Sequence, residues 1–258
     1  MQGADNGLTL ADLRGVDYYD ETWDLLLDQI DFDTDYEQIQ QLLFNINYGI
    51  SELDSVGLQG SNDIDGPVGL NKTMGAGSDI AGAGACAYPS EVVAASTFNT
   101  DLIEEEGRAI GEESFTFQGG GSNAVTGWYA PGLDMHRSPF NGRNFEYYSE
   151  DPVLSGKMAA AVVTGAADKG IVSYMKHFVL NDKELTQKLT FTWCNEQTFR
   201  EIYLRAYEIA VKEATMDMKY VSDGTVQTKT MRATMGIMTS HNQVGATWAG
   251  SHYNLITG

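Results

Sequence analysis

Three short apolar segments of this chain each run directly into a polar loop, and segments with helical spacing lie between them. The apolar segments are residues 128–130, 171–178 and 236–239. Apolar residues recur at helical spacing in residues 155–167 and 199–210. This repeated order of strand, polar loop, helix and strand predicts parallel βα units. Since α/β barrels build their sites at the C-terminal ends of their strands, the polar loops favour a barrel.

A doubly wound nucleotide-binding sheet is disfavoured, because no GxGxxG turn follows any of the strands. Walker, HExxH and GxSxG motifs are also absent from the sequence. The four histidines are scattered without zinc-ligand spacing, so we expect no metal and no cofactor.

The charge of the chain excludes some classes of partner. Lysine and arginine total 16 against 36 acids, a net charge of −20, which argues against nucleic acid and anionic membranes as partners. Cys86 and Cys194 are too few for a disulfide framework. No apolar run approaches the about 20 residues of a membrane span, and the N-terminus lacks the pattern of a signal peptide. The sequence therefore predicts a cytoplasmic protein without a membrane span.

Other segments carry weaker local signals. Helical spacing is visible around residues 23–30 and 39–43, and two helices separated by a cap near Asn99 follow Ser90. Asn195 is a candidate cap for the helix at 199–210. The remaining segments are predicted to be irregular: the Gly- and Ala-rich residues 71–89, a turn at 119–122 and a polar insertion at 215–233.

The densest polar tract runs from Gly127 to Asp151. It starts as an apolar strand and then gathers two arginines, a histidine, an Asn-Gly turn and four acids. Arginine side chains and aromatic rings together suit a polyhydroxylated ligand, with hydrogen bonds to hydroxyls and a flat ring beneath the sugar.

Several motifs in a fixed order make the sequence resemble the barrel domain of glycoside hydrolase family 3, of the β-glucosidase type. The motifs are DGPVG at 65–69, YPS at 88–90, GRAIGEE at 107–113, GRNFEYYSEDP at 142–152, KHF at 176–178, REIYL at 200–204 and SHN at 240–242. The resemblance covers residues from about 63 to the end of the chain. It implies a hydrolase that releases terminal β-D-glucosyl residues with retention, through two carboxyl groups about 5 Å apart.

The resemblance also implies roles for individual residues. Asp65, Arg143, Lys176 and His177 would bind substrate by holding sugar hydroxyls. His241 stands where the family usually has an aromatic residue, so it would face the sugar near the reacting carbon. A second departure, Ser138 after Arg137 where Asp is usual, occurs in a bacterial branch of the family.

The catalytic carboxylates implied by the resemblance are not found in the chain, so no catalytic residue is assigned. The family nucleophile lies on a later strand and is expected beyond Gly258; Ser222-Asp223 is rejected because no apolar strand precedes it. We therefore expect a partial (β/α)8 barrel over residues 16–258, lacking its last strands, with residues 1–15 as a linker or domain junction. The missing strands and an α/β-sandwich domain would come from the same parent or a second chain, and this chain alone would be inactive.

Simpler interpretations stay open. Asp65 could be a turn residue, Arg143 an ion-pair partner of Glu146 or Glu150, and His177 a core histidine. Asp134 could be loop structure or part of the site wall. The whole chain could be an inactive carbohydrate-binding barrel or have another specificity, such as that of a β-xylosidase; a hexosaminidase is disfavoured because its Asp-Ser-His loop is not visible after His177.

Overall fold

The computed structural model describes residues 3–44, 48–70, 85–116 and 124–257. Most of the predicted loop at 71–89 and the turn at 119–122 lie outside these residues. The chain divides into two compact units, one of residues 1–63 and 217–230, the other of residues 64–216 and 231–258. The predicted junction at residues 1–15 stays a prediction.

The first unit contains two short helices, α1 (Thr22–Leu27) and α2 (Tyr36–Phe44), as the spacing predicted. A 3-10 turn follows at Asp54–Val56. The small core of this unit consists of Leu13, Leu26, Leu53 and Val56. β5 (Thr215–Ser222) and β6 (Thr225–Arg232) form a hairpin, and most of it, residues 217–230, belongs to the same unit. The predicted polar insertion is therefore a two-stranded element.

The second unit is built on a four-stranded sheet in the order β1-β2-β3-β7. These strands are β1 (Asp63–Asp65), β2 (Gly127–Tyr129), β3 (Val172–Phe178) and β7 (Gly236–Thr239). β3 pairs in parallel with both β2 and β7. Three of the strands match the apolar segments seen in the sequence. β1 was not predicted, because its sequence, Asp63-Ile64-Asp65, contains no apolar run.

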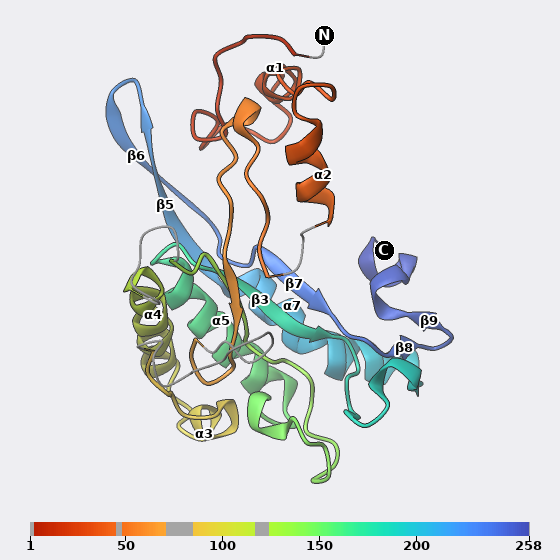
Figure 1. The fold of residues 1–258 in the computed structure, drawn as a ribbon. Coiled ribbons are helices and arrows are strands. Elements are labelled where there is room, and N and C mark those ends of the chain that lie inside the picture. The colour runs from red at the N-terminus through yellow and green to blue at the C-terminus, as the bar shows by residue number, and fades with distance from the viewer. Residues whose placement is uncertain (1–2, 45–47, 71–84, 117–123, 258) are drawn as a thin grey trace. The chain divides into compact units, whose positions relative to one another are not determined.

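Helices α4 (Thr100–Thr116), α5 (Pro152–Ala167) and α7 (Leu204–Glu213) lie side by side along the sheet (Figure 1). The short helix α3 (Glu91–Ala95) precedes α4, and α6 (Glu196–Thr198) leads through a π-helical turn into α7. Side-chain oxygens cap these helices as expected: Asn99 accepts from the amide of Leu102, and Asn195 from that of Thr198.

Parallel strands joined in sequence order by helices make this unit part of an α/β barrel, which confirms the predicted fold class. The barrel is not closed by the described residues, since β1 and β7 are the two edges of the sheet. Its core is continuous between sheet and helices and includes the fully buried Trp128, Met158, Ile171 and Met175.

The loops after β3 and β7 form a second, smaller sheet. β4 (Phe191–Thr192) pairs in parallel with β8 (Gln243–Val244), which pairs with β9 (Thr247–Trp248). The chain then forms a 3-10 turn and α8 (Tyr253–Ile256). Across the part of the chain that the structure describes, the helices lack the combination of length and apolar character that a bilayer span requires.

Candidate sugar-binding site

The predicted site residues lie at or beyond the C-terminal ends of the sheet strands. Asp65 is the last residue of β1, Lys176 and His177 lie near the end of β3, and His241 follows β7. Arg143 belongs to the long loop after β2, immediately before a 3-10 turn at Asn144–Glu146. The parallel arrangement brings these strand ends together at one end of the sheet.

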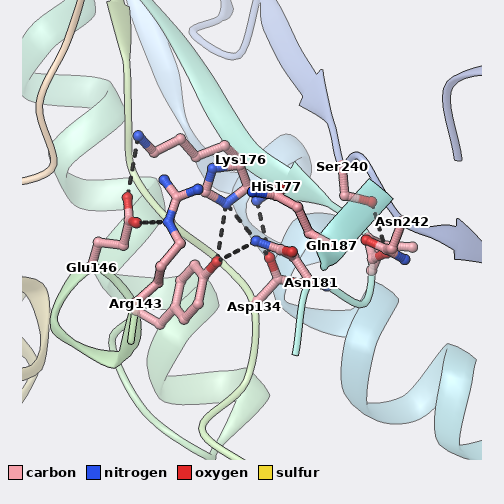
Figure 2. Close-up of polar contacts among 12 residues, drawn as sticks. Asp134, Arg143, Glu146, Lys176, His177, Asn181, Gln187, Ser240 and Asn242 are labelled. Carbon is pink, nitrogen blue, oxygen red and sulfur yellow. Dashed lines mark hydrogen bonds and ion pairs between the residues drawn. The ribbon is translucent and has the colours of Figure 1, made fainter. Parts of the chain in front are cut away.

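Three of the predicted residues meet through a buried carboxylate, Glu146. Lys176 Nζ lies 2.5 Å from Asp65 Oδ1 and 3.2 Å from Glu146 Oε2. Arg143 Nε pairs with the other oxygen of Glu146. Figure 2 shows Lys176 and Arg143 converging on this carboxylate from different elements. The cluster therefore balances two cations with two acids, which offsets the cost of burying them.

The members of this cluster differ in exposure, and the difference separates two roles. The side chains of Lys176 and Glu146 are only 1% and 2% exposed, while those of Asp65 and Arg143 keep 21% and 22% of their surface. The Asp65 turn is fixed by Trp128, whose indole Nε1 donates to the carbonyl of Gly66 at 2.7 Å. Asp65 and Arg143 can thus present an acceptor and a donor to a ligand, held by the buried pair.

Arg143 stays protonated in this setting. Burial by itself would lower the pKa of its guanidinium, but the Glu146 carboxylate raises that pKa above its ordinary value. Its Nη1 also lies 3.5 Å from Glu184 Oε1. The loop after β2 is therefore tied to the loop after β3.

His177 is oriented by a relay of hydrogen bonds. Asn181 Nδ2 donates to the Tyr147 hydroxyl at 3.1 Å, and that hydroxyl lies 3.0 Å from His177 Nδ1. Burial lowers the pKa of His177 well below its usual range, helped by the charges of Arg143 and Lys176. If the Tyr147 hydroxyl donates to Nδ1, the neutral ring carries its proton on Nε2.

Asp134 holds the backbone that follows Lys176. Its carboxyl oxygens accept from the amides of His177 and Asn181, each at 3.1 Å, and its side chain is fully buried. Burial, together with the charge of Asp182, raises the pKa of Asp134 to about 8. The Lys176–His177 and Phe178–Val179 peptide bonds in this segment are cis. Asp134 therefore acts on the site through the position of its neighbours.

The strand end after β7 is anchored to the same segment. The amide of Ser240 donates to the carbonyl of Phe178 at 2.7 Å, and Asn242 Nδ2 donates to that of Val179 at 3.1 Å. His241, between them, has an exposed side chain. The structure thus brings Asp65, Arg143 and Lys176 into one cluster and leaves His241 at its own strand end.

One further buried acid, Glu91 in α3, was not among the predicted site residues. Its carboxyl oxygens accept from the amide of Gly132 at 2.9 and 3.1 Å, and the residue is only 4% exposed. Burial raises the pKa of Glu91 well above its usual value. A single acid beside Val92 and Val93 was the only hint that it points inward.

Taken together, the partly exposed Asp65 and Arg143 offer an acceptor and a donor at the end of a partial α/β barrel, and the buried Lys176 and His177 lie beside them. Such a set suits hydroxyl groups better than an anion, because its positive charges are already paired. The roles of the individual residues in binding remain predictions.

The chain belongs to glycosyl hydrolase family 3: residues 59–242 match the family's N-terminal domain. It is 41% identical over 166 residues to beta-glucosidase A of Butyrivibrio fibrisolvens, covering 64% of this chain and 19% of that protein. It is 32% identical over 205 residues to a beta-glucosidase of Ruminococcus albus, covering 80% of this chain and 18% of the relative. The chain thus spans about a fifth of the length of these relatives.

Solved structures agree with the family and the fold. Beta-glucosidase 3B of Thermotoga neapolitana, in complex with alpha-D-glucose, superposes with a TM-score of 0.71 at 31% identity over 92% of this chain and 32% of that one. A beta-glucosidase of Paenibacillus barengoltzii gives a TM-score of 0.70 at 27% identity over 99% of this chain and 25% of that one.

Proposed function

We propose that this chain supplies the sugar-binding wall of a retaining β-glucosidase. Asp65, Arg143, Lys176 and His177 hold the hydroxyls of a terminal β-D-glucosyl residue, and His241 borders the same sugar. The observation that carries the proposal is the buried Lys176–Glu146 pair, which fixes Asp65 and Arg143 with their polar ends partly exposed. The family and the beta-glucosidase relatives support the choice of sugar.

Retention requires a nucleophile and an acid/base, and these are proposed to come from further barrel strands and an α/β-sandwich domain, from the same parent or from a second chain. The acids of the described cluster are committed to ion pairs, which suits binding more than attack on a sugar carbon. A cytoplasmic location remains a prediction from the sequence, which fractionation of cells would test.

Removing the Asp65 carboxylate tests the proposal. In the 258-residue chain, Asp65→Asn and Asp65→Ala should weaken glucose binding at least about ten-fold, because each removes a charge-assisted hydrogen bond to a hydroxyl. Ligand-observed NMR measures the affinity, and circular dichroism checks the fold. In the complete enzyme, Asp65→Ala should lower kcat/KM for an aryl β-glucoside about a hundred-fold or more.

Asp168→Ala is the matched control, since Asp168 pairs with Arg108 at 3.3 Å on a partly exposed surface and should leave glucose binding unchanged. The unmodified chain is expected to bind glucose without hydrolysing the aryl glucoside. An effect of Asp65→Ala no larger than that of the control would contradict the binding role. Turnover by the chain alone would contradict the assignment of the catalytic carboxylates to other parts.

A further inference from the structure

An apolar pocket lies between α3 and α4, on elements that carry none of the residues assigned to sugar binding. Its volume is about 280 Å³, whereas a dry protein cavity of about 150 Å³ is enough to hold a benzene ring. Its apolar wall is formed by the segment before α3 and by both helices, and includes Pro89, Val93, Ala94, Leu102, Ile103 and Ala109. The pocket is therefore large enough for a small aromatic or branched aliphatic molecule.

Part of this apolar wall faces solvent. The side chains of Val93 and Leu102 are 55% and 47% exposed, whereas Ile103 is buried in the core. The hydroxyl of Thr97, which also lines the pocket, donates to the carbonyl of Ala94 at 2.7 Å, so the backbone already satisfies it. Because apolar surface gains free energy when it leaves water, a ligand with an apolar body is favoured here.

Glu106, in the middle of α4, brings a carboxylate to this wall. The neighbouring acid Glu104 pairs with Arg108. Farther along the helix, Glu112 pairs with Lys169 at 2.7 Å. Across the ranges that the structure describes, Glu106 has no hydrogen-bond or ion-pair partner, and burial raises its pKa to about 7. A partly buried acid without a counter-charge is a group that a bound cation would stabilise.

The titratable groups around Glu106 are acidic or phenolic. Glu105 lines the same pocket at an exposed position. Burial, helped by acids that include Glu106, raises the pKa of Tyr88, of Glu91 in α3 and of Tyr148 in the loop after β2. An anionic ligand would be repelled by Glu105 and Glu106, whereas an ammonium group supplies both a positive charge and three hydrogen-bond donors.

We infer that this pocket, which we name the Glu106 pocket, binds a small primary amine with an apolar body, such as an arylalkylamine. The apolar body lies against Val93 and Leu102, and the ammonium group donates to the carboxylate of Glu106. The negative charge of Glu105 favours the same cation from the rim of the pocket. The inference does not depend on the proposed function, because the pocket shares no residue with the sugar cluster.

The test compares an amine with its uncharged analogue. Phenethylamine and phenethyl alcohol are titrated into the 258-residue chain and its variants by ligand-observed NMR. The titrations are made at about pH 8, above the pKa of Glu106 and below the pKa of about 10.4 that is typical of an alkylammonium group. The amine should bind saturably and at least about ten-fold more tightly than the alcohol, because it forms a charge-assisted hydrogen bond with Glu106.

Glu106→Gln should lower the affinity for the amine about ten-fold and leave the affinity for the alcohol nearly unchanged. Ala109→Leu, which fills the pocket from α4, should weaken the binding of both ligands. Glu112→Gln is the matched control, because it makes the same charge change on the same helix outside the pocket, and it should alter neither affinity. Circular dichroism checks the fold of each variant.

Three results would overturn the inference. The first is that the amine does not bind saturably, or binds no better than the alcohol. The second is an effect of Glu106→Gln on amine binding that is no larger than the effect of Glu112→Gln. The third is displacement of the amine by glucose, because the amine would then occupy the sugar cluster. Failure of glucose itself to bind would bear on the proposed function and leave the Glu106 pocket unaffected.

Discussion

At the scale of single residues, Glu146 is the centre of the site although it reaches no ligand in our proposal. It is buried between Lys176, which lies in β3, and Arg143, which lies in the loop after β2. The sequence offered Glu146 or Glu150 as a structural partner of Arg143, and the structure selects Glu146. This ion pair is compatible with ligand binding by Arg143, because the guanidinium remains partly exposed.

Replacing Glu146 by Gln should destabilise the fold and weaken glucose binding together. After the change, Asp65 is the remaining acidic partner of Lys176, whose side chain is 1% exposed. Breaking a buried ion pair in this way lowers the free energy of unfolding by about 3 kcal/mol. Denaturant unfolding measures the stability. Glu150→Gln, at an exposed position of the same loop, should change little. Equal stability of the two variants would show that Glu146 does not anchor the cluster.

At the scale of elements, α4 and α5 cross at glycines that allow their backbones to touch. A Cβ on Gly165 would lie 2.0 Å from the carbonyl oxygen of Glu104, and one on Gly107 would lie 2.2 Å from that of Val162. The crossing positions α5 against β3, whose end carries Lys176 and His177. Close helix packing far from the ligand thus sets the position of the strand end.

Gly165→Ala should therefore destabilise the protein, although alanine favours a helix by about 1 kcal/mol over glycine. The methyl group would force the helices apart, and overpacking of this kind costs about 1–3 kcal/mol or more. Thermal and denaturant unfolding measure the change in the free energy of unfolding. Gly142→Ala is the control, because a Cβ there meets nothing within 4 Å. A stabilised Gly165→Ala variant would contradict the close crossing.

At the scale of the whole molecule, buried acids should make stability depend on pH. The pKa of Asp134 is raised to about 8 and that of Glu91 well above its usual value, so the folded state keeps protons that the unfolded state releases above about pH 4. Their stabilising contribution is complete at low pH and is lost as the pH rises through the folded-state pKa. The lowered pKa of His177 has the opposite effect on stability. Its contribution to the free energy of unfolding is lost as the pH falls below about 6.5.

We therefore expect the free energy of unfolding to fall as the pH is raised from about 6.5 to 8.5, by up to about 1.4 kcal/mol per pH unit for each acid still protonated. Denaturant titrations across this range measure it. Glu91→Gln keeps an acceptor for the Gly132 amide and removes the titrating group, so its profile should be flatter. A profile of unchanged slope in that variant would exclude Glu91 as a contributor.

The sequence alone determined the features that depend on neighbours along the chain. The periods of β3, β7, α5 and α7 were readable because each element shows its own pattern of apolar residues, and the motif order indicated the family. β1 and the β5–β6 hairpin were missed, the first because Asp-Ile-Asp contains no apolar run and the second because its segment is rich in exposed polar residues. In β5, Met216, Met218 and Tyr220 do alternate with polar residues, a local strand pattern that the predicted insertion did not use.

Only the tertiary structure decided how the site is assembled. Lys176 and Asp65 are 111 residues apart in sequence and 2.5 Å apart in space, and which acid lies between Lys176 and Arg143 depended on the path of the loop after β2. The shifted pKa values of His177, Asp134 and Glu91 likewise follow from burial, which is a property of the packed fold. The residue types predicted the chemistry of the site. The role of each residue depends on distances and desolvation, which arise only on folding.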